Sequence, residues 1–262
     1  MKRSAFTLAE ILVTLAIIGV VAALTIPTLI NNYQRKVLET KFKKTYAEIG
    51  VLFKTIMGMD GVTTLYQTSI YEGCGDSCHN RQLDLSKYIK LTRFNENYNF
   101  HDFFGGGDNE IRCATSYCFM NAAGILYEMD ATMTKPASVG GKPYIDVLAD
   151  LNGPQLPNAL GKDIFGFRVD NNGIVYAYGQ AGIPYRTDTI DAAQLALCIA
   201  SENDVRDLYD GGLGGDEWSN ASELEKESIV KETMESLKMQ DNTMNGWGCG
   251  LRIIEDGAIT YY

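Results

Sequence analysis

The sequence predicts an α+β fold, in which one long N-terminal helix packs against an antiparallel β-sheet head with loop insertions and disulfides. Three observations support this prediction. The run 11–34 contains no charged side chain and is mostly Ile, Leu, Val and Ala up to residue 30. Residues 38–56 place apolar side chains three and four positions apart, which is helical periodicity. The remainder, 58–262, has turn motifs between short apolar segments, together with all six cysteines.

The composition is that of a folded protein whose charge is unevenly distributed. The 262 residues are 45% hydrophobic, and 23 basic against 33 acidic side chains give a net charge of −10. Residues 1–60 hold 8 basic and 4 acidic side chains, whereas residues 61–262 hold 15 and 29. Because phosphate contacts need a basic surface, the acidic part argues against nucleic acid as a partner. Only two histidines, His79 and His101, and no nucleophile elbow or Walker loop argue against an enzyme.

The N-terminal segment has the length of a membrane span. Residues 1–5 form a short basic leader, and residues 11–30 would rise about 30 Å as a helix, the hydrocarbon thickness of a bilayer. A secretory signal peptide also combines a basic start with an apolar run. The run here is longer than that, and it ends at 25–30 without a small-x-small cleavage site. A simple membrane anchor remains open on these grounds.

Glu10 lies at the start of this apolar run. An ionised carboxylate is costly there unless it has a partner, so such a residue is a candidate functional residue. The nearest cation that could neutralise it is a free N-terminal amine, created by cutting the leader just upstream. That amine would lie on the same chain or on a neighbouring one.

The segment 4–13, Ser-Ala-Phe-Thr-Leu-Ala-Glu-Ile-Leu-Val, resembles the class III signal of type IV pilins and type II secretion pseudopilins. The resemblance covers about residues 1–55. It implies that a prepilin peptidase cuts between Ala5 and Phe6, that Phe6 becomes N-methylphenylalanine, and that Glu10 is the acid at the fifth mature position. The family usually has Gly before the cut, and this chain departs from that pattern with Ala5.

Further expectations follow from the same resemblance. Gly19 and Pro27 fall where many family members loosen the helix. The implied partners are other pilin or pseudopilin subunits in a filament, the prepilin peptidase/methyltransferase, the bacterial inner membrane and assembly platform proteins. The head would be extracytoplasmic on a single-pass anchor, and the chain would later enter a pilus or pseudopilus. The parts expected are a leader at 1–5, a transmembrane and assembly half-helix at 6–30, an amphipathic half-helix at 31–57 and a globular head at 58–262.

The second half of the helix combines an apolar stripe with a basic surface. From Phe6 to Met57 the helix would measure about 78 Å, and Pro27 should bend or locally melt it. Its basic side chains either form a solvated face near lipid head groups or pair with acidic heads of adjacent subunits. The stripe is Leu38, Phe42, Tyr46, Ile49, Phe53 and Ile56, and the cations are Arg35, Lys36, Lys41, Lys43, Lys44 and Lys54.

In the head, three turns rich in Asn, Asp or Gly predict β-hairpins and hence an antiparallel sheet. A second helix is predicted at 222–238, where Ser222-x-x-Glu225 is a capping box. The hairpin strands expected are 117–120 with 125–129, 164–169 with 174–178, and 251–254 with 258–262. The apolar stripe expected on the second helix is Leu224, Val230, Met234 and Leu237.

The even number of cysteines in an exported head predicts disulfides. Six cysteines allow fifteen pairings, and spacing does not select one. We favour Cys74–Cys78, Cys113–Cys118 and Cys198–Cys249, because the last would staple the final hairpin back across the helical insertion. The alternative is a zinc site of Cys74, Cys78, His79, Cys113 and Cys118, which an oxidising compartment disfavours.

Two acidic loops are also candidates for calcium, which binds six to eight oxygen ligands and which some pseudopilins hold in the head. One runs from Asp146 through Asp150, Asn152 and Gly153 to Asp163, and the other is 170–173. Neither has EF-hand spacing, and the second is already explained as a hairpin turn. Ordinary turn chemistry is the favoured interpretation, so no metal or cofactor is predicted.

The function expected is that of a structural subunit of a type II secretion pseudopilus or a type IV pilus. The insertion at 199–245 favours a minor or tip position with a large head, where the subunit could bind a ligand. The alternative is a membrane-anchored extracytoplasmic binding or enzymatic domain that never polymerises. An uncut N-terminus in the mature protein would favour that alternative.

Overall fold

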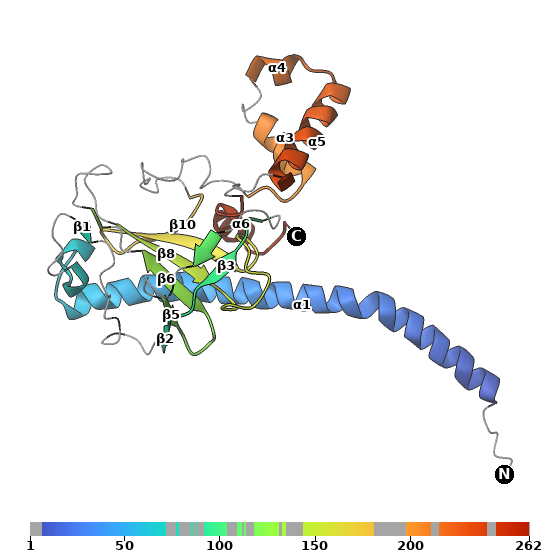
Figure 1. Ribbon diagram of the computed structural model, residues 1–262, viewed down its shortest axis with the longest axis horizontal. Coiled ribbons are helices and arrows are strands. Elements are labelled where there is room, and N and C mark those ends of the chain that lie inside the picture. Colours follow the sequence, from blue (N-terminus) through green and yellow to red (C-terminus); the bar gives the residue numbers. More distant parts are fainter. Residues whose placement is uncertain are drawn as a thin grey trace, which may run out of the picture.

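The computed structural model has one long helix, a β-sheet head and a smaller group of helices (Figure 1). It describes residues 7–71, 77–78, 85, 88, 92–103, 109–111, 113, 118–130, 133–134, 144–180, 198–210, 215–239 and 245–261.

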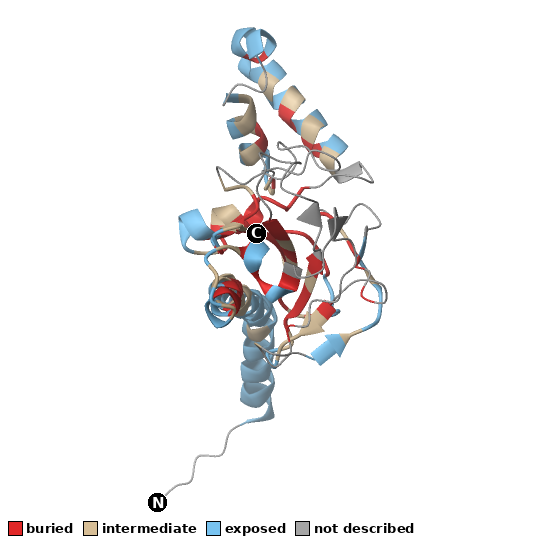
Figure 2. Ribbon diagram, turned by 90° about the vertical axis from the view of Figure 1, so that its left-hand side faces the viewer, coloured by how far each residue is buried: buried red, intermediate tan, exposed pale blue. Residues whose placement is uncertain are grey.

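Helix α1 is one continuous helix, Leu8–Met59, close to the predicted bounds. Pro27 lies inside it without ending it, and Figure 1 shows the helix bending within its N-terminal half. That half is exposed along almost its whole length, whereas the C-terminal half lies against the head (Figure 2). The helix is followed by two short 3-10 turns, η1 Leu65–Gln67 and η2 Ser69–Tyr71.

The head is built on a six-stranded antiparallel sheet of order β10-β9-β8-β6-β5-β2. Two of the three predicted hairpins are confirmed, β5–β6 around residues 121–124 and β9–β10 around 171–174. Most residues of the central strands β8 and β9 are buried, because both faces of the sheet are covered. The strands are β2 Thr92–Phe94, β5 Cys118–Met120, β6 Leu126–Asp130, β8 Tyr144–Asp150, β9 Ile164–Asp170 and β10 Val175–Ala177.

Two small two-stranded sheets accompany this main sheet, and the sequence analysis predicted neither of them. One pairs β1 with β7, and the other pairs β3 with β4. Their strands are only two or three residues long, too short for an alternating pattern to be recognised. They are β1 Ser77–Cys78, β7 Met133–Thr134, β3 Tyr98–Phe100 and β4 Asn109–Ile111.

The core between α1 and the sheet is aromatic and aliphatic. Phe42 packs edge-on against Phe165, with ring centroids 4.9 Å apart, and 5.5 Å from Phe167. These three rings are at most 1% exposed. Phe165 and Phe167 alternate with Gly166 along β9, so they point to the same face of the sheet, the one that α1 covers.

The predicted C-terminal hairpin is wrong, because residues 249–256 form helix α6, Cys249–Asp256. The buried positions in this segment are Cys249, Gly250 and Ile253, which lie on one face at helical spacing. Gly257, interpreted as a hairpin turn, is instead the left-handed C-cap of α6 with φ +70°. A helix and a hairpin compete for such a short segment, and packing against the sheet selected the helix.

The insertion forms a small helical subdomain with its own core, which Figure 1 shows standing away from the sheet beyond α6. The capping box Ser222–Glu225 is confirmed at the start of its longest helix. The predicted place of Leu224 in the apolar stripe is wrong, since it is 81% exposed. Leu224 lies six positions before the buried Val230, so the two side chains point about 120° apart around the helix axis. The helices are α3 Glu202–Leu208, α4 Gly215–Asn220 and α5 Glu223–Met239.

Candidate functional site

The N-terminus of α1 is closed by a capping box between Thr7 and Glu10. The Thr7 backbone N–H and hydroxyl both donate to the Glu10 carboxylate at 2.8 Å, and the Glu10 N–H donates to the Thr7 hydroxyl at 3.3 Å. The carboxylate therefore has polar partners within a single chain. The predicted cleavage pair, Ala5 and Phe6, lies outside the described residues.

The first half of α1 presents a long apolar surface that no other described residue covers. It is the one described helix that is long and apolar enough to cross a membrane, and none of its most apolar stretch is buried. Side chains on all sides of the helix are exposed, which suits either lipid or neighbouring helices. A Cβ at Gly19 would meet no other atom, so the chain leaves room around that position. The most exposed apolar side chains here are Leu8, Leu24, Leu29, Ile18 and Val20.

The second half of α1 holds the head through polar contacts as well as the aromatic core. Lys41 donates to the Leu151 carbonyl at 2.7 Å, and the Tyr46 hydroxyl donates to the Val175 carbonyl at 3.0 Å. Lys43 bonds to Glu39 and to the Gly257 carbonyl.

The basic surface was interpreted as either solvated or facing adjacent subunits. Two of these lysines, Lys41 and Lys43, also bond to carbonyl groups of the chain's own head. Lys36 and Lys44 form ion pairs along α1 with Glu39 and Glu48.

A groove of about 600 Å³ runs between α1 and the β5–β6 hairpin. On one side lie Lys44, Glu48 and Leu52 of the helix, and on the other the turn at Asn121 and the ring of Tyr127. Glu48 accepts hydrogen bonds from the Tyr127 hydroxyl at 3.1 Å and from the Asn121 side chain at 3.3 Å. Burial, with the Glu48 carboxylate close by, raises the pKa of Tyr127. The hydroxyl therefore stays protonated and ties the hairpin to α1.

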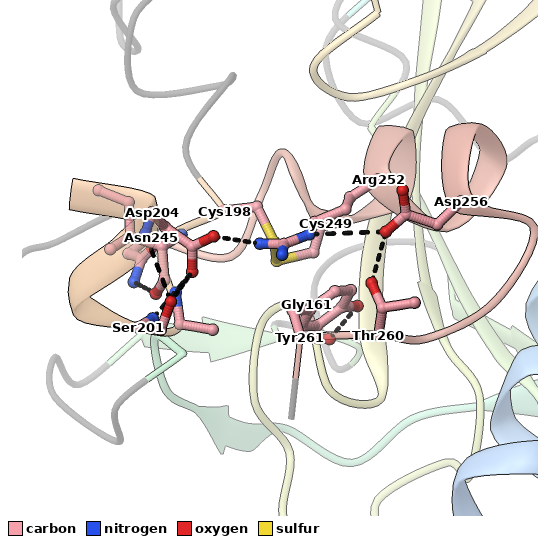
Figure 3. Close-up of a disulfide and its surroundings, with 12 residues drawn as sticks. Gly161, Cys198, Ser201, Asp204, Asn245, Cys249, Arg252, Asp256, Thr260 and Tyr261 are labelled. Atoms are coloured by element: carbon pink, nitrogen blue, oxygen red, sulfur yellow. Dashed lines mark hydrogen bonds and ion pairs between the residues drawn. A yellow bond between two sulfur atoms is a disulfide. The ribbon is translucent and has the colours of Figure 1, made fainter. Parts of the chain in front are cut away.

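The helical subdomain is mounted on the head by three kinds of bond, drawn in Figure 3. Cys198 and Cys249 form a disulfide that joins the start of the insertion to α6. Asn245, fully buried, donates to the Ile199 carbonyl at 2.7 Å and accepts from the Ile199 N–H at 2.8 Å. These two hydrogen bonds link residue 199, at the start of the insertion, to residue 245, at its end.

An ion pair completes this base, since Arg252 of α6 donates to Asp204 of α3 at 2.7 Å. Burial acts to raise the pKa of Asp204. The Ala200 amide, the Ser201 hydroxyl and Arg252 more than offset it, so this pKa is lowered. The carboxylate is therefore charged and bonded at neutral pH. A capping box at Ser201 and Asp204 could have revealed α3 in the sequence, and neither this pair nor Asn245 was predicted.

Gly161 lies under the same disulfide, at φ +76°. A Cβ at this position would come within 2.7 Å of the Cys249 sulfur, so a side chain has no room. The Gly161 carbonyl accepts a hydrogen bond from the Tyr261 hydroxyl at 2.7 Å, which fixes the C-terminal segment beside it.

The structure contains two of the three expected disulfides, Cys113–Cys118 and Cys198–Cys249. The pair Cys74–Cys78 lies outside the residues whose side chains are described. The zinc alternative is wrong for Cys113 and Cys118, because these two sulfurs are bonded to each other and cannot both act as thiolate ligands.

The expected acidic loops do not bring three carboxylates to one point among the described residues. Asp146 makes a bidentate pair with buried Arg168 at 2.6 and 2.7 Å. Asp170 accepts from the amides of its own turn, Asn172 and Ile174. Within the part of the chain that the structure describes, no three acidic, His or Cys side chains form a cluster that could hold a metal ion.

The comparison with known families identifies the N-terminal segment. Residues 1–26 match the family model of the prokaryotic N-terminal methylation motif. This segment is a prepilin-type signal of the type IV pilin and pseudopilin kind. No curated protein and no solved structure matches the chain.

The signal and the structure agree with each other. A prepilin-type signal continues here into a long apolar helix that packs on an antiparallel sheet head with two disulfides, which is an α+β pilin-like fold. The signal is that of a prepilin peptidase substrate, and the apolar helix fits a protein anchored in the inner membrane.

Proposed function

We propose that this chain is a structural subunit of a type II secretion pseudopilus or a type IV pilus, cut between Ala5 and Phe6 and N-methylated on Phe6. The observation that carries the proposal is the methylation motif at 1–26, continuous with an apolar half-helix that the described part of the head leaves uncovered. In the membrane this surface would contact lipid. In a filament the same surface would pack against neighbouring subunits, which removes it from water.

Glu10 would change its hydrogen-bonding partner when the subunit moves from the membrane into the filament. In the single chain its carboxylate is bonded by Thr7. In a filament we expect it to pair with the methylated amine of Phe6 on a neighbour. A buried carboxylate without a counter-charge costs several kcal/mol, so this pair would select one axial register between subunits.

The helical subdomain supports a minor or large-headed position. It lies on the side of the sheet away from α1 (Figure 1). If α1 is at the filament core, the subdomain therefore faces outwards. Removal of the leader takes away Lys2 and Arg3, so 21 basic against 33 acidic side chains leave a mature net charge of −12.

Intact-mass and N-terminal analysis of the membrane-extracted protein tests the proposal. The expected species lacks residues 1–5 and carries one additional methyl group on Phe6. Shear release of a filament fraction containing the chain is the second expected result. A mature chain that retains Met1 and stays wholly in the membrane fraction would instead identify a single-pass anchored domain that does not polymerise.

A further inference from the structure

Two carboxyl groups are buried at the ends of the loop between β8 and β9, outside the contacts described above. Asp150, the last residue of β8, is 1% exposed, and Asp163, just before β9, is fully buried. The Leu151 N–H donates to the Asp163 carbonyl at 2.8 Å, which holds the two loop ends together. Two negative charges in a shared buried site cannot both be accommodated cheaply.

The cations around this loop bind elsewhere. Neither carboxylate forms an ion pair within the described residues. The Lys41 ammonium reaches the loop from α1 but bonds to the Leu151 carbonyl. The Lys162 ammonium lies 5.0 Å from the centre of the Phe103 ring.

Among the described residues, none of the other titratable groups nearby forms an ion pair with Asp150 or Asp163. His101 meets the loop through its backbone, since its N–H donates to the Asn158 carbonyl and its carbonyl accepts from Leu160. Tyr98 of β3 bonds to Asp150, and Glu128 of β6 adds negative charge near the Tyr98 phenol. The pair therefore has an excess negative charge if both groups ionise.

The hydrogen bonds indicate which group carries the proton. Both oxygens of Asp163 accept backbone N–H groups, from Asn158 at 2.9 Å and from Ala159 at 2.7 Å, which favours its charged form. Asp150 has a single short bond, 2.7 Å to the Tyr98 hydroxyl, and a longer one of 3.1 Å from the Asn152 amide. Burial raises the pKa of both groups, against the hydrogen bonds in the case of Asp163, and burial together with the neighbouring Asp163 raises the pKa of Asp150 to about 8.

We propose that Asp150 and Asp163 hold one proton between them, carried by Asp150, and that this proton makes the β8–β9 loop a pH-sensitive joint of the head. The loop touches α1 through Lys41 and the C-terminal segment through the contact of Gly161 with Tyr261. Loss of the proton therefore weakens the place where helix, sheet and C-terminus meet.

The raised pKa of Asp150 makes the folded head less stable as the pH rises. The pKa of Asp150 is raised above its ordinary value of 3.8, so its contribution to stability is complete below about pH 4. That contribution is lost progressively as the pH rises towards about 8.

Thermal unfolding of the full chain in detergent, recorded from about pH 5 to pH 8, tests the proposal with the variant Asp150→Asn. The amide imitates the protonated acid and does not titrate. We expect the variant to melt a few °C above the wild type at pH 5, and this difference to widen by about 4 °C or more at pH 8. Asp170→Asn is the matched control, because this carboxylate also accepts turn amides but is partly exposed. Asp170→Asn keeps the same charge change outside the buried pair, so the widening of the difference should be specific to Asp150→Asn.

A difference between Asp150→Asn and wild type that is the same at every pH overturns the proposal. So does a rise in the wild-type melting temperature on adding calcium chloride at pH 8 that Asp150→Asn abolishes, because a cation would then neutralise the pair. If the variant does not fold, infrared difference spectra of the wild type decide. A buried carboxylic-acid carbonyl band should disappear between pH 6 and pH 9, and its absence at pH 6 overturns the proposal.

Discussion

The two halves of α1 share one helical geometry and use it in opposite ways. Residues 8–30 expose apolar side chains all round the helix, and nothing else in the described chain covers them. Residues 31–59 bury a single stripe that includes Phe42, Ile49 and Phe53, and they add polar contacts to the head. The first half therefore offers an apolar surface suited to lipid or to neighbouring helices, whereas the second half is part of the core of the head.

The largest difference expected between the halves is in assembly. Glu10→Val should leave membrane insertion and cleavage intact but reduce filament incorporation more than tenfold, because it removes the charge pair proposed between Glu10 and the amine of Phe6 on a neighbour. Thr14→Val is the matched control, since Thr14 lies on the same exposed half-helix and its hydroxyl bonds only locally, to the Ile11 carbonyl. Sheared filaments are quantified against the membrane fraction. Normal incorporation of Glu10→Val would remove the proposed role of this residue.

The halves should also differ in their effect on head stability. Phe42→Ala removes a fully packed ring and should lower the free energy of unfolding by about 3–5 kcal/mol. Leu12→Ala, in the exposed half, should change it by less than about 0.5 kcal/mol. Both values come from denaturant unfolding of the full chain in detergent. Equal effects of the two substitutions would contradict the conclusion that only the second half of α1 contributes to the stability of the head.

The disulfide Cys198–Cys249 extends the comparison to the helical subdomain. Replacing both cysteines with Ala should destabilise the subdomain by about 2–4 kcal/mol, because the bond closes a long loop. Hydrogen exchange should rise in α3 and α5 and remain nearly unchanged in β8 and β9. An equal rise in the sheet would mean that the subdomain and the sheet unfold as one unit.

The smallest effect concerns the polar contacts of the second half. Lys41→Met should cost about 1–2 kcal/mol, because the Leu151 carbonyl loses a charged donor from α1. Lys36→Met removes a lysine whose side chain is 75% exposed and pairs only along the helix, so it should cost less than about 0.5 kcal/mol. Denaturant unfolding of the two variants under identical conditions separates them.

Much of the molecule could be predicted from local pattern. The signal, the length of α1 and the capping box at Ser222 depend on residues close together in the chain, and so do the hairpins at 121–124 and 171–174. Helix α6 was missed because an eight-residue segment followed by Gly suits a hairpin as well as a C-capped helix. Helix α3 was missed although a capping box at Ser201 marks it.

The amino-acid sequence by itself determined the prepilin-type signal, the apolar half-helix and the turns, because each follows from side-chain chemistry within a few residues. Only the tertiary structure decided that Lys41 and Lys43 bind the chain's own head, that Asp146 pairs with Arg168, and that Asp150 and Asp163 share a buried site. The physical reason is that burial and charge pairing depend on distance in space. The contacts that set them join residues as many as 214 positions apart in the chain.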